Sequence, residues 1–132
     1  MIRLTRLDHF GIEVTDLRRA ERFYTETLGL PVRTRIGDHQ VLLDCGDAVL
    51  ALIRVEAIAV DGEANIRRPL GRGHWAFEVS GDDFRRAQAG FTGAGIPVHG
   101  PIDWGDHDCL YFTDPDGNLL ELINNERLYR TG

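Results

Sequence analysis

Three side chains are candidate metal ligands because of their types and their places in the chain. His9 and His74 each open a stretch with the pattern His-aromatic-small-apolar-Glu-Val, at residues 9–14 and 74–79. Glu121 lies inside an otherwise apolar stretch, where a carboxylate is costly unless it is paired or bound to a cation. Two imidazoles and one carboxylate form a ligand set that leaves coordination positions open. We therefore predict one divalent metal ion per chain, Fe(II), Mn(II), Ni(II), Co(II) or Zn(II), bound by His9, His74 and Glu121.

The two histidine stretches belong to a repeat that runs through the whole chain. The offset between matching residues is 65 for the two histidines, 67 for the Arg-Arg-Ala triplets that begin at residues 18 and 85, and 66 for Gly29 and Gly95. Three matches in the same order indicate a duplicated module. We predict a single domain over residues 1–132, made of a first module at 1–56, a connecting loop at 57–71 and a second module at 72–126.

Each module is expected to have the element order βαβββ. In the first module, Phe10, Ile12 and Val14 alternate with small or polar residues, which is typical of a strand. Asp16 can cap a helix that runs through Leu28, and Gly29 follows as its stop signal. The other expected elements are strands near 32–37, 39–44 and 48–55, then a strand at 73–79, a helix at 83–93, and strands near 98–102, 109–113 and 118–123. The fold class is therefore α+β, with two pseudo-symmetric modules.

The two faces of each opening strand are expected to have different roles. The apolar residues Phe10, Ile12, Trp75 and Phe77 would pack against the helices, whereas the small and polar residues between them suit the lining of a cleft. We expect the loop 57–71 to order over this cleft.

The repeat also predicts an open side of the metal site. Residues 46–53 align with residues 116–123, so the counterpart of Glu121 is Ala51. A fully symmetric site would have four protein ligands. With alanine at the fourth position, that side of the metal is left for water or substrate.

Composition excludes several classes of function. Hydrophobic residues make up 42% and charged residues 27% of the chain, which is ordinary for a globular domain. The net charge of −6 argues against nucleic-acid binding, which needs a basic face. No apolar run is long enough to cross a membrane or to form a signal peptide, so we expect a cytoplasmic protein. We expect Cys45 and Cys109 to be free thiols.

The chain resembles the vicinal oxygen chelate superfamily, which includes glyoxalase I, fosfomycin-resistance proteins, bleomycin-resistance proteins and extradiol dioxygenases. The resemblance is carried by Leu7-Asp8-His9, by Phe23-Tyr24 with Leu28-Gly29-Leu30, and by residues 74–79 and 111–122. It implies an incomplete barrel of two βαβββ modules, a divalent metal, small-molecule substrates that chelate the metal through adjacent oxygens, and a homodimer.

The resemblance implies a metal-dependent enzyme, and extradiol dioxygenases are one reaction type that fits. These enzymes use His/His/Glu ligands and a tyrosine near the position of Tyr111. We expect the metal to act as a Lewis acid, and Tyr111 and His107 to be the catalytic proton donors or orienting groups. Glyoxalase I-like isomerases generally have a glutamate where this chain has Ala51, which argues against their reaction.

Two alternatives stay open. Fosfomycin-resistance thiol transferases share the His/His/Glu pattern, but they bind the phosphonate with a threonine where this chain has Gly11, and with a lysine in a segment where it has only His99 as a basic group. Arg127 and Arg130 could supply positive charge instead. A non-catalytic drug-binding protein of the bleomycin-resistance type is the second alternative. It characteristically lacks the metal ligands, although Trp104 among the acidic residues of 103–108 would suit a flat cationic ligand.

Overall fold

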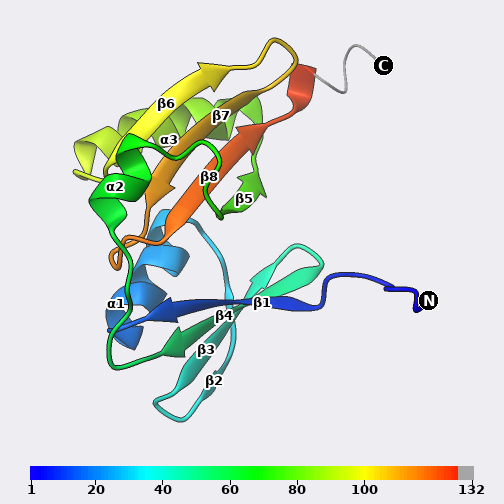
Figure 1. Ribbon diagram of the computed structural model, residues 1–132, viewed down its shortest axis with the longest axis vertical. Helices are drawn as coiled ribbons and strands as arrows, with labels where there is room; N and C mark the ends of the chain where they lie inside the picture. Colours follow the sequence, from blue (N-terminus) through cyan, green and yellow to red (C-terminus); the bar gives the residue numbers. More distant parts are fainter. Residues whose placement is uncertain (128–132) are drawn as a thin grey trace. The chain divides into compact units, whose positions relative to one another are not determined.

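Each half of the repeat folds into an open four-stranded sheet with helices packed on it (Figure 1). The structure is a computed structural model, and it describes residues 1–127. The chain divides into two compact units, Met1–Ala59 and a second unit that begins at Val60. The strand orders are β1-β4-β3-β2 and β5-β8-β7-β6. In each sheet the first pair is parallel and the other pairs are antiparallel, which confirms the predicted α+β fold of two βαβββ modules.

The first unit follows the predicted element order. Its elements are β1 (His9–Val14), α1 (Leu17–Arg22), a π-helical turn η1 (Phe23–Thr27), β2 (Val32–Ile36), β3 (Gln40–Cys45) and β4 (Ala48–Arg54). Strand β1 alternates exposed and buried residues along its length, as the sequence pattern predicts. Asp16 caps α1, because its Oδ1 accepts a hydrogen bond from the backbone N–H of Arg19 at 3.0 Å.

The first helix differs from the prediction in its last turns. It is α-helical only as far as Arg22 and then widens into η1, where the backbone N–H of Leu28 donates to the carbonyl of Phe23. This places Tyr24, which is fully buried, in the core of the first unit. Gly29 ends the segment with a φ of 71°.

The second unit repeats this plan and adds one helix. Its elements are α2 (Gly62–Arg67), β5 (Trp75–Glu78), α3 (Gly81–Gly93), β6 (Val98–Asp103), β7 (Asp108–Thr113) and β8 (Leu119–Asn124). Helix α3 begins two residues before the predicted start because Ser80 caps it, with its Oγ accepting from the N–H of Asp83 at 3.1 Å. Gly95 follows α3 with a φ of 71°, the same value as its counterpart Gly29.

Helix α2 lies in the segment 57–71, for which the sequence indicated no regular element. Its first turn is capped by Asp61, whose Oδ1 accepts from the N–H of Ala64 at 3.0 Å. The helix contacts β6, β7 and β8 of the second unit. Six residues are too few to be a stable helix alone, so this packing is what holds α2.

The two faces of the second sheet carry different helices. Phe112 packs against Phe91 of α3, with ring centroids 4.7 Å apart. Its neighbour Tyr111 belongs to a small apolar cluster with Cys109 and Leu119, against which Ile66 of α2 packs. Successive strand residues point to opposite faces, so α3 covers one face and α2 lies on the other. The face with α2 is the one on which Tyr111 lies.

The expected burial of the opening strands is met more fully in β1 than in β5. Phe10 and Ile12 are buried, whereas Trp75 keeps 39% of its surface exposed. An Asp-Pro-Asp-Gly turn at residues 114–117 joins β7 to β8. The Asp114 carboxylate accepts hydrogen bonds from the N–H groups of Asp116 and Asn118.

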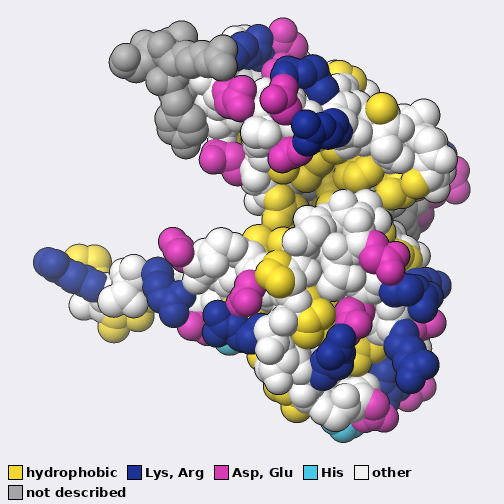
Figure 2. Space-filling view, turned by 180° about the vertical axis from the view of Figure 1, so that it is seen from behind, with side chains coloured by type: hydrophobic (Ala, Val, Ile, Leu, Met, Phe, Trp, Pro, Cys, Tyr) yellow, Lys and Arg dark blue, Asp and Glu magenta, His cyan; other side chains and the backbone are white. Residues whose placement is uncertain are grey.

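The surface mixes the two signs of charge. Figure 2 shows arginine and acidic side chains interspersed on the visible faces of both units. Several of them are paired, including Arg33 with Asp44 and Arg35 with Glu21. Within residues 1–127, no helix is long and apolar enough to cross a membrane.

Candidate metal centre

His74 and Glu121 lie directly against each other in the second unit. The Nε2 atom of His74 is 2.8 Å from Oε1 of Glu121, and the two side chains are 27% and 9% exposed. His74 immediately precedes β5, and Glu121 lies on the neighbouring strand β8. The structure therefore brings together two of the three predicted ligands, one imidazole and one buried carboxylate.

The His74 ring is held in one orientation by the backbone. Its Nδ1 lies 2.7 Å from the carbonyl oxygen of Arg72, which can only accept a hydrogen bond. Nδ1 is therefore the protonated nitrogen, and Nε2 faces the Glu121 carboxylate. A ring nitrogen fixed in this way by a carbonyl is the usual arrangement of a metal-binding histidine. Nε2 and Oε1 of Glu121 are 2.8 Å apart, which is hydrogen-bonding distance.

Tyr111 is the third member of this group. It pairs with Glu121 across β7 and β8, and its ring meets the His74 ring edge-on at a centroid distance of 5.3 Å. Burial, followed by the negative charge of Glu121, raises the pKa of Tyr111 to about 12. The phenol therefore keeps its proton at neutral pH and is a hydrogen-bond donor beside the carboxylate.

His9, the remaining predicted ligand, is the first residue of β1 in the other unit. Its Nδ1 lies 2.8 Å from Oδ2 of Asp8, and this hydrogen bond is the largest of the effects that lower the pKa of Asp8. Asp8 also pairs with Arg6 at 3.1 Å. Among residues 1–127 the structure holds no group of three or more His, Cys, Asp or Glu side chains gathered for a metal. His9 as a ligand therefore stays a prediction.

The strand register supports the predicted equivalence of Ala51 and Glu121. Gly11 lies opposite Ala51 in the parallel pair β1 and β4, and Ala76 lies opposite Glu121 in the parallel pair β5 and β8. Gly11 and Ala76 are matching residues of the repeat. A methyl group thus occupies the first-unit position that corresponds to the carboxylate.

The structure does not bring His107 to this group. His107 lies in the turn between β6 and β7, next to the Asp106 carboxylate, and its ring stacks on Trp104 with an interplanar angle of 19°. It is four residues from Tyr111 along β7, which corresponds to about 13 Å of strand. Besides His74, a second imidazole lies near Tyr111: that of His99, which pairs with Tyr111 across β6 and β7 at a ring distance of 6.5 Å.

The register of the β6–β7 hairpin determines that His99 is the residue opposite Tyr111. It shifts between His99 and Ile102, so one strand carries extra residues at that point. The residue opposite Tyr111 therefore cannot be found by counting residues along the hairpin in the sequence.

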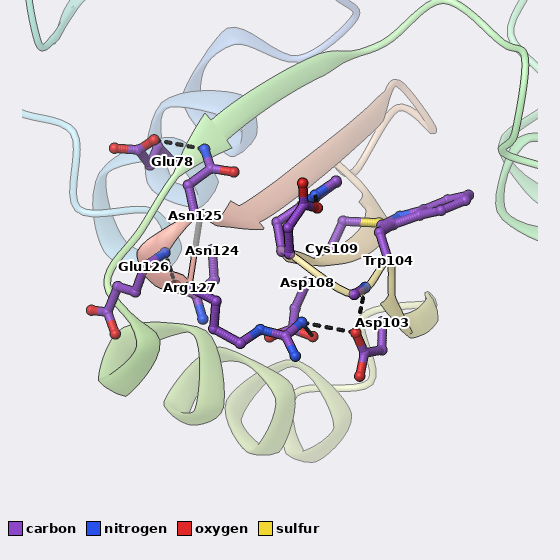
Figure 3. A network of polar contacts seen from close by, with 12 residues as sticks. Glu78, Asp103, Trp104, Asp108, Cys109, Asn124, Asn125, Glu126 and Arg127 are labelled. Carbon is purple, nitrogen blue, oxygen red and sulfur yellow. Dashed lines mark hydrogen bonds and ion pairs between the residues drawn. The ribbon is translucent and has the colours of Figure 1, made fainter. Parts of the chain in front are cut away.

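Arg127 is engaged in a different part of the second unit. Its Nη2 lies 2.8 Å from both Asp103 and Asp108, and hydrogen bonding to Asp103 is the main cause that raises the pKa of Arg127 (Figure 3). The guanidinium therefore joins the ends of β6 and β7 to the segment after β8. Arg130 lies outside the described residues.

The two cysteines are free thiols, as predicted. Cys109 is buried, and its Sγ accepts a hydrogen bond from Nε1 of Trp104 at 3.2 Å. Burial raises the pKa of both thiols. Neither group has the lowered pKa of a reactive nucleophile.

Comparison with known proteins gives the family. The model of the glyoxalase/bleomycin resistance protein/dioxygenase superfamily matches residues 6–122. The chain belongs to this superfamily. The sequence resemblance is therefore confirmed at the level of the family.

Members of the superfamily with different activities are among the relatives. The chain is 31% identical over 121 residues to glutathione transferase FosA from Serratia marcescens, covering 90% of this chain and 80% of the relative. It is also 31% identical over 117 residues to metapyrocatechase 2 from Cupriavidus necator, covering 88% of this chain and 32% of the relative. A solved structure of the fosfomycin resistance protein FosX from Mesorhizobium loti matches with a TM-score of 0.74 and 21% identity, over 98% of this chain and 100% of that one, which shows the shared fold.

Proposed function

We propose that this chain is a divalent-metal-dependent enzyme whose small substrate binds the metal through two oxygens. The proposal is supported chiefly by the contact of His74 Nε2 with Glu121 Oε1 at 2.8 Å. A buried carboxylate and an imidazole at this separation can both lie about 2.0–2.2 Å from one cation. We propose His9 as the third protein ligand, on the strength of the repeat that relates it to His74.

The donor set fits a divalent metal ion of intermediate hardness. One carboxylate oxygen and two imidazole nitrogens suit Fe(II), Mn(II), Co(II), Ni(II) or Zn(II), and three protein ligands leave positions for substrate. When it is bound, the metal supplies Lewis-acid stabilisation of negative charge on the substrate oxygens. Arg72 contributes through its carbonyl, which keeps Nδ1 of His74 protonated and Nε2 directed at the site.

The chain's own proton donor is Tyr111. Its hydroxyl is protonated at neutral pH and lies beside Glu121, so it can donate a hydrogen bond to a substrate oxygen held at the same place. Tyr111 therefore orients the substrate and stabilises charge on it. A catalytic role of His107 stays a prediction, and it requires a substrate that reaches the β6–β7 turn.

Ring opening of a catechol is the first reaction that we propose. A catechol offers two adjacent oxygens, and a metapyrocatechase is among the relatives. The chain spans about a third of that relative's length, so its substrate range is a separate question. We further propose that the protein works as a homodimer in the cytoplasm.

Transfer of a thiol to fosfomycin is the second candidate reaction. It is favoured by the match to glutathione transferase FosA, which extends over most of both chains. Two observations weigh against it. A Cβ on Gly11 would lie 2.9 Å from Cδ1 of Ile53, so a threonine there would displace Ile53. Arg127 is engaged by Asp103 and Asp108.

The test is turnover by protein loaded with Fe(II), Mn(II) or Zn(II), with oxygen consumption measured on catechol and conjugate formation measured on fosfomycin with glutathione. We expect catechol turnover that falls at least about 100-fold in Glu121→Gln, since a metal ligand is lost. The control His39→Gln removes a histidine from the β2–β3 turn and should leave turnover unchanged. Conjugation without catechol turnover would favour the second reaction. Tight binding of bleomycin-type drugs without either activity would contradict the enzyme proposal.

A further inference from the structure

We propose that Asn65, on helix α2, is a positioning residue that sets the geometry of the His74–Glu121 pair. Its effect on metal affinity rests on the proposed function, whereas its effect on the His74 ring does not. No sequence motif pointed to Asn65 or to a helix within the segment 57–71. The argument comes from the hydrogen bonds that join α2 to the supports of both ligands.

The Asn65 side chain makes two hydrogen bonds in opposite directions. Its Nδ2 donates to the carbonyl of Gly117 at 3.2 Å, and its Oδ1 accepts from Nη1 of Arg72 at 3.2 Å. Gly117 lies just before β8, and Arg72 lies just before His74. One amide thus links the segments from which the two candidate ligands come.

The contact with Arg72 leads to the imidazole. The Arg72 guanidinium is held at two points of the α2 region, because its Nε also donates to the carbonyl of Arg68 at 2.7 Å. These two hydrogen bonds of the guanidinium restrain Arg72. The backbone carbonyl of Arg72 in turn accepts a hydrogen bond from Nδ1 of His74 at 2.7 Å. The orientation of the His74 ring therefore depends on α2 through Arg72.

The contact with Gly117 leads to the carboxylate. A Cβ on Gly62 would lie 2.7 Å from the Cα of Gly117, so the first turn of α2 rests directly on the turn before β8. The Gly117 N–H donates to the carbonyl of Asp114, which closes that turn. Strand β8 begins two residues later at Leu119 and carries Glu121 as its third residue. Helix α2 therefore also fixes the entry of the strand that holds the carboxylate.

Both supports meet at Asn65, so its removal should disturb the pair without removing either ligand. Groups that orient metal ligands typically contribute a factor of about 10–100 to metal affinity. The amide is partly buried and lies within the second unit, where all of these contacts are found.

The experiment compares Asn65→Ala with wild type in two measurements on the full chain. Zinc affinity is measured by competition with a chromophoric chelator, and the His74 ring is observed in the zinc-free protein by long-range proton–nitrogen NMR. We expect about 10–100-fold weaker zinc binding. We also expect the signal of a His74 ring with its proton on Nδ1 to give way to an average over both ring nitrogens.

The matched control is Asn125→Ala. This amide also bonds a side chain of the second unit, since its Nδ2 donates to Oε2 of Glu78 at 2.7 Å, but it is not joined to α2 (Figure 3). It should leave both measurements unchanged. Asn65→Asp keeps the acceptor for Arg72 and loses the donor to Gly117, so it should keep the His74 signal while it weakens zinc binding.

Two results would overturn the proposal. One is an Asn65→Ala protein with wild-type zinc affinity and an unchanged His74 signal. The other, used if Asn65→Ala does not fold, is an Asn65→Asp protein that binds zinc as wild type does. A wild type that binds no zinc would contradict the proposed function, and the His74 signal of the zinc-free variants would still decide the role of Asn65.

Discussion

Tyr111 connects the candidate ligands to the apolar part of the second sheet. On one side it meets His74 and Glu121, and on the other it belongs to the cluster with Cys109 and Leu119. A phenol in this position is desolvated and lies next to a negative charge, and both effects disfavour its ionisation. The same two effects make it a proton donor that stays protonated across the physiological range.

The raised pKa of Tyr111 predicts a loss of stability at high pH. The folded-state pKa of about 12 lies above the ordinary value of 10, so the folded protein holds this proton more tightly than the unfolded chain. The contribution is full below about pH 10 and disappears as the pH rises toward 12. We expect spectrophotometric titration to show one tyrosine that ionises near pH 12 and that is missing in Tyr111→Phe. A Tyr111 that ionises near pH 10 would contradict the buried contact with Glu121.

Some residues of the candidate site could be predicted from the sequence, and others could not. His74 and Glu121 were predicted because a repeat, and a single acidic residue in an apolar strand, can be recognised in the sequence. The structure brings these two side chains into contact. The catalytic role of His107 stays a prediction, and the pairing of His99 with Tyr111 depends on a register shift between β6 and β7 that the sequence does not reveal. The supports of His74 were missed because they are backbone and amide groups with no sequence signature.

At the scale of elements, an ion pair joins the first helix to the edge strand of its sheet. Arg35 on β2 donates from Nε and Nη2 to the two carboxylate oxygens of Glu21 on α1, at 2.7 and 3.0 Å. Hydrogen bonding to Arg35 is the largest of the effects that lower the pKa of Glu21. A bidentate contact of this kind is stronger than most surface pairs, although solvent still screens it.

Removal of this pair should cost stability in a pH-dependent way. Because the folded-state pKa of Glu21 is lowered, its contribution is present above the ordinary glutamate value and is lost as the pH falls through the lowered value. We expect Glu21→Gln to lower Tm by about 1–4 °C at neutral pH, and the difference from wild type to shrink in acid. Thermal unfolding followed by circular dichroism measures this. A Glu26→Gln control with the same loss would show that the pair is not the cause.

The close approach of α2 to the turn before β8 makes another prediction. Alanine at Gly62 would place a methyl group 2.7 Å from the Cα of Gly117, where backbone cannot move aside cheaply. We expect Gly62→Ala to destabilise the protein by about 1–3 kcal/mol in urea unfolding. Gly90 in α3 has no atom within 4 Å of such a methyl group, so Gly90→Ala should stabilise by about 0.5–1 kcal/mol. Equal effects of the two changes would contradict the packing of α2.

Element prediction succeeded where periodicity or a cap defined the element. Strand β1 followed its alternation, and α1 began after Asp16 as predicted. The π-helical turn at Phe23–Thr27 was missed because its apolar spacing also fits an α-helix. Helix α2 was missed because a short helix held by packing has little pattern of its own.

At the scale of the whole molecule, the duplication explains the strand order and the pairing of both sheets. Equal sequence blocks fold into equal units, β1-β4-β3-β2 and β5-β8-β7-β6. The two modules differ at one position of the predicted site, since Ala51 occupies the position that matches Glu121. The sequence could relate His9 to His74 by symmetry. The role of His9 as a ligand stays a prediction.

The most direct test of the central claim is the stoichiometry and affinity of divalent metal binding. Protein purified without chelators or nickel resin would be titrated calorimetrically with Zn(II) and Mn(II), as wild type, His9→Ala, His74→Ala and the control His39→Ala. We expect one metal per chain in wild type and in the control, with binding weakened at least about 100-fold in the other two variants. A folded wild type that binds neither metal, or His9→Ala and His74→Ala variants that bind as the control does, would contradict the claim.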